Sequence, residues 1–95
     1  MRQYETLYIL RPDMETEKTQ ELVERFKGVV TNHEGELGEV NEWGKRRLAY
    51  EIDDFREGYY VLMKYQAATD FTKELERLFK ISDDVIRYMT LRIEE

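Results

Sequence analysis

The alternation of two helix-like stretches with four strand-like ones is the strongest constraint on the fold. Apolar residues recur at helical spacing at Leu22, Phe26 and Val29/Val30, and again at Phe71, Leu75, Leu78 and Phe79. Segments rich in aromatic and β-branched residues lie around them, at 3–10, 36–53, 59–66 and 85–93. The order strand, helix, strand, strand, helix, strand is that of the split βαβ, or ferredoxin-like, fold. We therefore predict an α+β chain, βαββαβ, with two helices on one face of a four-stranded antiparallel sheet.

Capping and turn-forming residues indicate where these elements end. Asp13 or Thr16 is expected to cap the first helix, and residues 69–70 the second, through side-chain oxygens. Gly44 interrupts the long second strand and is expected to mark a bulge or bend. Residues 53–58 are expected to form the turn of a hairpin between the second and third strands.

The residue types present argue against catalysis. There is no cysteine, and His33 is the single histidine, so neither a catalytic triad nor a metal cluster can be assembled. The carboxylate pairs at 53–54 and 83–84 are explained by turn chemistry. An acylphosphatase-like protein of this fold would cradle phosphate near residues 11–13, but no glycine is present there. We expect no catalytic residues, no metal, no cofactor and no small-molecule substrate.

Length and hydropathy indicate a single domain over residues 1–95 that works in the cytoplasm. The chain opens without the basic and then apolar leader of a secreted protein. No stretch approaches the ~20 apolar residues of a membrane-spanning helix, so no membrane partner is expected.

Charge is unevenly distributed along a chain whose net charge is −6. Residues 13–42 hold nine acids and three bases, whereas residues 43–50 hold three consecutive cations, Lys45–Arg47, and no acid. Cations on an edge strand protect it against pairing with other chains. They also suit a binding patch for phosphate or acidic groups beside Trp43. Both interpretations are compatible, and a net acidic chain is expected to bind RNA weakly on its own.

The sheet face that the helices leave uncovered is a second candidate surface. Such a face normally alternates to polar side chains, but the strands here are apolar on both parities. In the first strand, for example, Tyr4 and Tyr8 lie on one parity and Leu7 and Ile9 on the other. Either set makes an apolar docking surface, or merely a scatter of ordinary surface hydrophobes. The sequence does not decide which parity faces solvent.

The stretch Gly-Lys-Arg-Arg-Leu-Ala-Tyr-Glu-Ile at 44–52 resembles the signature of the bacterial small-subunit ribosomal protein six family. The segments 1–5, 58–60 and 81–87 also match that family at their expected places, and the similarity covers the whole chain. The resemblance implies a structural ribosomal protein that binds the central domain of small-subunit ribosomal RNA. It also implies a protein partner, small-subunit ribosomal protein eighteen, whose basic charge would supply much of the phosphate neutralisation.

The resemblance also assigns candidate residues to each partner. Those expected to contact the protein partner are Glu42, Trp43, Arg46 and Arg47. Those expected to contact RNA, mainly its phosphates, are Arg2, Tyr4, Lys64, Arg77, Lys80 and Arg87. For Arg77 and Lys80 the plainer explanation is a solvated helix face on which Glu76 and Lys80 pair.

An alternative function is a stand-alone binder of single-stranded RNA, of the RNA-recognition-motif type. Such a protein stacks bases on aromatic side chains of its two central strands. Four tyrosines keep this alternative open: Tyr4, Tyr8, Tyr60 and Tyr65. Its glycine- and aromatic-rich signature is missing from residues 58–66.

Overall fold

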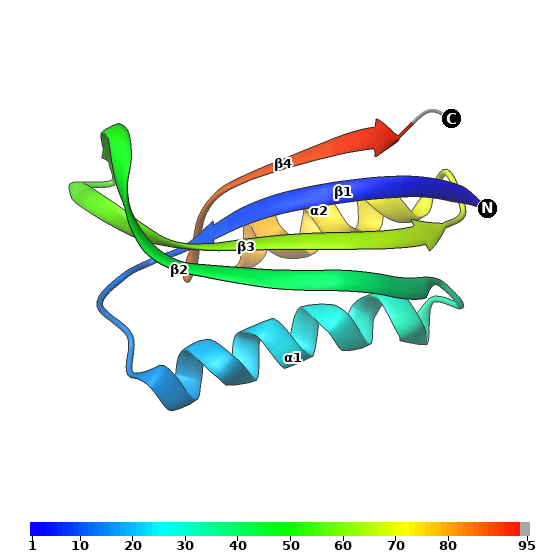
Figure 1. Cartoon of the computed structure of the whole chain (residues 1–95), viewed down its shortest axis with the longest axis horizontal. Helices are drawn as coiled ribbons and strands as arrows, with labels where there is room; N and C mark the ends of the chain where they lie inside the picture. The colour runs from blue at the N-terminus through cyan, green and yellow to red at the C-terminus, as the bar shows by residue number, and fades with distance from the viewer. Residues whose placement is uncertain (94–95) are drawn as a thin grey trace.

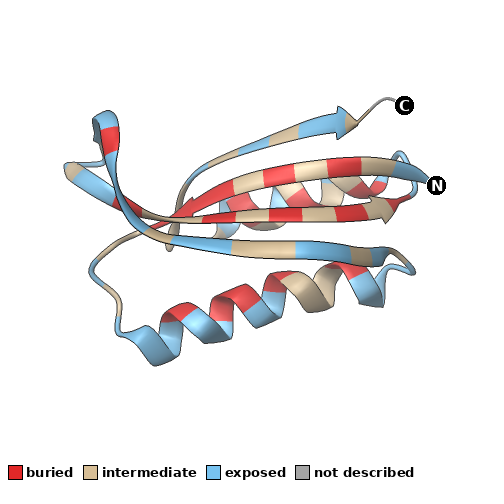
Figure 2. Cartoon of the chain, viewed as in Figure 1, coloured by how far each residue is buried: buried red, intermediate tan, exposed pale blue. Residues whose placement is uncertain are grey.

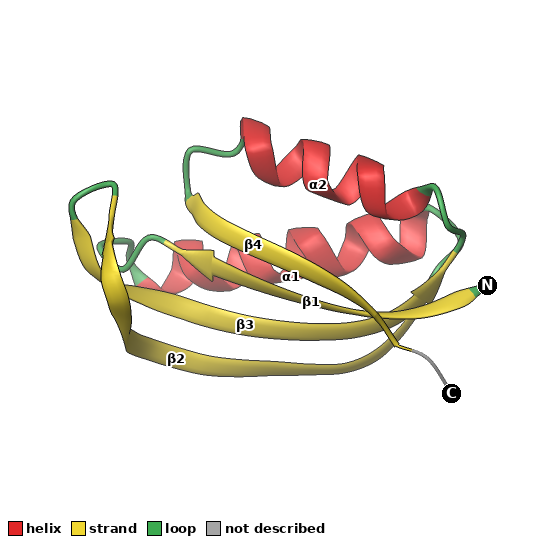
Figure 3. Ribbon diagram, turned by 90° about the horizontal axis from the view of Figure 1, so that it is seen from above, coloured by secondary structure: helices red, strands yellow, loops and turns green. Residues whose placement is uncertain are grey.

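The computed structural model describes residues 1–93, and it contains six elements in the expected order. They are β1 (Arg2–Leu10), α1 (Thr16–Asn32), β2 (Glu36–Ile52), β3 (Phe55–Ala67), α2 (Phe71–Ile81) and β4 (Val85–Ile93). The strands form one antiparallel sheet in the order β2-β3-β1-β4, and both helices lie on the same face of it (Figures 1 and 3). The prediction of a ferredoxin-like α+β fold is therefore confirmed. The last two residues of the predicted domain 1–95 lie outside the described residues.

The core lies between the helices and one parity of each strand (Figure 2). From β1 this parity contributes four buried residues, Tyr4, Thr6, Tyr8 and Leu10. Rings from three elements meet at its centre, where the centroids of Tyr8, Phe26 and Phe79 lie 4.8–5.2 Å apart. Leu7 and Ile9 consequently lie on the open face, which answers the question of parity that the sequence left open.

The two helices begin without the side-chain caps that the sequence predicted. The residue before α1 is Glu15, which makes no capping hydrogen bond. Asp13 instead accepts two hydrogen bonds from the Arg11 guanidinium, at 2.7 and 3.1 Å. A charge-assisted pair of this kind is stronger than a bond to a neutral backbone N–H, so the Asp13 carboxylate pairs with Arg11 and does not cap α1. Asp70 stands at the predicted cap position of α2, but its side chain makes no capping bond either.

Helix α1 ends in a Schellman motif whose left-handed position is occupied by a glutamate. Glu34 has φ 63° and donates from its backbone N–H to Thr31, while Gly35 donates to Val30. Glycine normally fills the left-handed position, but here it comes one residue later. A Cβ on Gly35 would lie 2.8–2.9 Å from Val30 and the Gln66 carbonyl oxygen, so close packing explains this glycine.

Replacing Glu34 with glycine should therefore stabilise the protein. The change removes the steric cost of a Cβ at positive φ, which exceeds the entropy that glycine adds to the unfolded chain. We expect the free energy of unfolding, measured by urea denaturation, to rise by about 0.5–1 kcal/mol. Glu34→Ala is the control, since it removes the charge but keeps the Cβ. An equal gain in Glu34→Ala would contradict the backbone explanation.

The β2–β3 hairpin is longer and more curved than predicted. Its turn is only Asp53–Asp54, both in the left-handed region at φ 50° and 68°, and β3 begins at Phe55 instead of Tyr59. The register between the two strands shifts at three places, and the shift between Glu42 and Gly44 confirms the predicted bulge. Each shift gives β2 residues without a counterpart in β3, which bends β2. The hairpin tip therefore leaves the plane of the sheet (Figure 1).

Candidate protein and nucleic-acid interfaces

The open face of the sheet carries a band of apolar side chains from all four strands. Two of its residues on β4, Met89 and Leu91, are 51% and 52% exposed. On the β2 side, the Trp43 ring stacks on Tyr60 with centroids 6.0 Å apart. The Arg46 guanidinium lies over the Trp43 ring at 5.5 Å from its centroid. Trp43 and Arg46 thus belong to one stacked group on the open face.

A groove of about 230 Å³, called the tip groove below, lies on this face where the hairpin tip bends over the sheet. The residues that line it are Leu7, Ile9, Leu48, Ala49, Tyr50, Ile52, Tyr60, Arg87, Tyr88 and Met89. Ile9 and Leu48 are buried at its base. Arg87 of β4 donates to the Tyr50 hydroxyl and lies over the Tyr50 ring, which joins β4 to the hairpin tip.

Lys64, a predicted RNA contact, also lies on the open face but at the opposite end. Its ammonium nitrogen is 3.7 Å from a carboxylate oxygen of Glu5 and 3.7 Å from one of Glu39. Two carboxylates beside one ammonium leave a net negative charge, which repels phosphate. The surroundings of Lys64 therefore do not favour an RNA contact.

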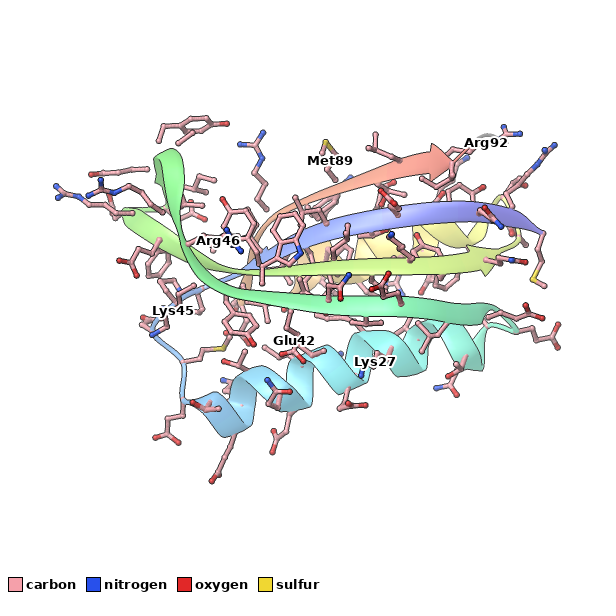
Figure 4. All side chains as sticks on the ribbon, viewed as in Figure 1. Lys27, Glu42, Lys45, Arg46, Met89 and Arg92 are labelled. Carbon is pink, nitrogen blue, oxygen red and sulfur yellow. The ribbon has the colours of Figure 1, made fainter. Side chains whose placement is uncertain are left out.

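The four residues predicted to contact the protein partner do not share one face. Arg46 points away from the helices, whereas Glu42 points toward α1 (Figure 4). Glu42 accepts hydrogen bonds of 2.7 Å from Gln20 of α1 and from the Tyr59 hydroxyl. Partial burial and the hydrogen bond to Glu42 raise the pKa of the Tyr59 hydroxyl. Glu42 thus ties the edge strand to α1, while Trp43 and Arg46 face outward from the sheet.

A stripe of exposed cations runs along α2. Lys73, Arg77 and Lys80 are spaced at i, i+4 and i+7, which places them on one side of the helix. The Arg77 guanidinium donates to both carboxylate oxygens of Glu74, at 2.5 and 3.0 Å, and holds the pKa of that carboxyl below its usual value. The predicted pairing of Glu76 with Lys80 is wrong, because Lys80 has no ion-pair partner within residues 1–93. The ion pair on this helix joins Arg77 to Glu74.

Two further arginines lie at the sheet end formed by the start of β1 and the end of β4. Arg92 lies near the end of β4 (Figure 4) and pairs with Tyr4 in the register of the strands, and Arg2 is two residues before Tyr4 in β1. Tyr4 itself is 7% exposed and stacks on Tyr65, so its ring serves the core and we do not carry it into an RNA interface. The sequence reasoning missed Lys73 and Arg92, although helical spacing from Arg77 would have indicated Lys73.

The described residues offer little to a catalytic interpretation. No group of three or more histidine, aspartate or glutamate side chains in residues 1–93 is placed to hold a metal ion. Arg11, the cation of the hypothetical phosphate loop, is engaged by Asp13. Within the same residues no helix is long and apolar enough to cross a membrane.

Fold and surfaces together define a small α+β module suited to binding other macromolecules, through an apolar open face and a cationic helix. Comparison with known proteins makes the class more specific. The family model described as Ribosomal protein S6 matches residues 3–92. The chain belongs to the ribosomal protein S6 family, a family of small-subunit ribosomal proteins.

The sequences of individual relatives align with this chain over nearly its whole length. The small ribosomal subunit protein bS6 of Desulforudis audaxviator is 52% identical, over 97% of this chain and 98% of its own length. That of Carboxydothermus hydrogenoformans is 50% identical, over 97% and 96%. The crystal structure of 30S ribosomal protein S6 from Thermotoga maritima superposes with a TM-score of 0.93 at 32% identity, over 97% of this chain and 87% of that one. The predictions of a non-enzymatic ribosomal protein of the small subunit, and of a cytoplasmic location, are confirmed.

Proposed function

We propose that this protein binds the central domain of small-subunit ribosomal RNA together with small-subunit ribosomal protein eighteen, and so helps to assemble the platform. The observation that carries the proposal is the separation of an apolar surface from a cationic one. The apolar open face with Trp43 and Arg46 suits a protein, and the cations of α2 and the adjoining strand ends suit phosphate. The unit that does this is the single domain of residues 1–95.

The RNA surface in this proposal follows α2 and the adjoining strand ends. Four cations that are in no ion pair within residues 1–93 form it, Arg2, Lys73, Lys80 and Arg92, and Arg77 lies among them but is paired with Glu74. Residues 71–93 hold five bases and four acids, whereas residues 13–42 hold three bases and nine acids. The α2–β4 side is therefore less repulsive to a phosphate backbone than the α1 side. Because the protein's net charge is −6, such contacts position it on RNA and the partner supplies most of the affinity.

The surface for the protein partner in this proposal is the open face and the edge of β2. Trp43 and Arg46 present a stacked aromatic and guanidinium pair, the residue types enriched in interface centres. Glu42 and Arg47 lie where a partner that wraps around the edge of β2 would meet them. Arg87 lies on the open face, so we place it with this surface and not with the RNA contacts.

The stand-alone RNA-binding alternative is less well supported. It needs aromatic rings free on the open face to stack bases. Tyr4, Tyr8 and Tyr65 are buried against the helices, and Tyr60 already stacks on Trp43.

Measuring RNA binding with and without the partner tests the proposal. We expect titration with the central-domain RNA to give weak binding for this protein alone and tight binding once ribosomal protein eighteen is added. Equal affinity in both titrations would favour the stand-alone RNA binder. Absence of binding in both would rule the proposal out.

A further inference from the structure

The outer edge of β4 is open to a further strand. β4 pairs with β1 on one side, and among the described residues 1–93 no strand pairs with its other side. Such an edge presents unpaired backbone N–H and C=O groups that can form hydrogen bonds with another strand. The ladder with β1 is regular from Arg87 to Ile93, since its register shift lies beyond Ile9, at the start of β4. The stretch 87–93 is therefore a regular strand with one open side.

The two edge strands of the sheet are protected to very different degrees. β2 carries charged residues along its whole length and three register shifts, and both features hinder pairing with another chain. Residues 87–93 contain no proline, no lysine and no acidic residue. Two of their apolar side chains, Met89 and Leu91, are about half exposed. Charges and bulges thus protect β2, whereas β4 is left able to pair.

The order of side chains along β4 is complementary to itself. Met89 and Leu91 stand on either side of Thr90 on the open face. An antiparallel second copy, related by a two-fold axis through Thr90, therefore sets Met89 of each copy opposite Leu91 of the other. Directly opposed apolar side chains stabilise a strand pair. An axis through Met89 would instead set Leu91 opposite Arg87, so the register about Thr90 is the better one.

Charge does not oppose this pairing. In the register about Thr90, Arg87 lies opposite Ile93 of the second copy and Arg92 opposite Tyr88, so no two cations face each other. An arginine beside a tyrosine ring adds a cation–π contact. The segment from α2 to β4 holds five bases and four acids, and is close to neutral although the net charge of the chain is −6. Two copies can therefore approach through β4 with less repulsion than through the acidic α1 side.

We propose that the free protein forms a two-fold symmetric dimer in which two β4 edges pair about Thr90 and join the two sheets into one. Pairing through a single strand of each copy gives a small interface, of the size class of weak and transient complexes, so the dimer forms at high protein concentration. The pairing needs neither RNA nor a partner protein and does not depend on the proposed function. Arg92 lies both in this edge and in the proposed RNA surface, so a chain bound to RNA there is not free to pair.

Cysteine pairing reads the register directly, because the chain contains no cysteine of its own. In the proposed dimer the Cβ atoms of residues 89 and 91 of opposite copies lie about 5 Å apart, whereas residue 89 lies about 7–8 Å from its own counterpart. A disulfide needs Cβ atoms about 4 Å apart. We mix equal amounts of Met89→Cys and Leu91→Cys in a glutathione redox buffer and identify the disulfides by mass spectrometry. We expect the mixed disulfide to exceed its statistical share relative to either homodimer at least about fivefold.

Sedimentation equilibrium of the unchanged chain measures the association itself. We expect the average mass to rise with concentration toward that of a dimer. Leu91→Lys should abolish this rise, because it sets an ammonium group against Met89 of the other copy. Ile81→Lys is the matched control, since it makes the same kind of change at an exposed apolar residue of α2, away from the edge. It should associate as the unchanged chain does.

Each other result overturns the inference. A chain that stays monomeric at every concentration forms no such dimer. Loss of association in Ile81→Lys as well would indicate non-specific adhesion of exposed apolar residues, and association that survives Leu91→Lys would lie on another surface. A statistical ratio of disulfides would exclude the register about Thr90. None of these results concerns the binding of ribosomal protein eighteen, so the proposed function stands or fails separately.

Discussion

Truncating Phe79 to alanine should lower the free energy of unfolding by about 3–5 kcal/mol. Phe79 is 1% exposed, and its ring lies 4.8–5.3 Å from the rings of Phe26, Tyr8 and Tyr88. Alanine would leave a cavity bounded by three rigid rings from three different elements, which cannot close without moving both helices. The loss is a large part of the ~5–15 kcal/mol that stabilises a typical domain.

Urea denaturation of Phe79→Ala and of a control variant, Ile81→Ala, tests this prediction. Ile81→Ala changes an apolar residue two positions further along α2 that is 63% exposed, and we expect it to cost under about 0.5 kcal/mol. Equal losses in Phe79→Ala and Ile81→Ala would mean that helix propensity sets the cost. A loss below about 1.5 kcal/mol for Phe79→Ala would show that the core collapses onto the vacated space.

The two helices could be predicted because burial on one side imposes a helical period on each of them. Phe26 and Phe79 stand on apolar stripes that are visible in the sequence, and both reach the same aromatic centre. The facing of the strands could not be predicted, for a physical reason. Leu7 and Ile9 line the tip groove on the open face, so both parities of β1 are apolar and either could be taken for the core side.

The hairpin shows what local signals cannot convey. Residues 53–58 contain two aspartates and a glycine, which is typical of a long turn. Gly58 is instead a strand residue, and a Cβ there would lie 2.2 Å from a methyl of Ile9. This glycine serves a contact between residues far apart in the sequence, so only the fold explains it.

The candidate site was predictable as a set of charges and not as an arrangement. Sequence identified Lys64 and Arg77 as cations, but the carboxylates beside Lys64 come from two other strands. Strand alternation alone separates Glu42 from Trp43, whereas the register shift between Glu42 and Gly44 brings Trp43 and Arg46, three residues apart, onto the same face. A bulge predicted from Gly44 indicates that the alternation is interrupted, but only the pairing of β2 with β3 shows which side chains then share a face.

Replacing Arg46 and Arg47 together with glutamate should weaken binding of ribosomal protein eighteen about 100-fold or more, or about 2.8 kcal/mol. The reversal removes the guanidinium stacked on Trp43 and sets two carboxylates against any acidic residue of the partner. Like charges brought together at an interface cost several kcal/mol, so this is the largest effect on binding that we expect. Isothermal titration of the partner at fixed salt measures it.

The sign of this effect separates local recognition from overall attraction. A basic partner is drawn to a more acidic protein, so long-range attraction alone predicts that the added glutamates strengthen binding. Lys18→Glu with Arg25→Glu changes the net charge by the same amount on α1, on the covered side of the sheet, and serves as the control. We expect this control to bind as well as the unchanged protein or slightly better. If both double variants bind more tightly, the stacked arginine on the open face is not part of the interface.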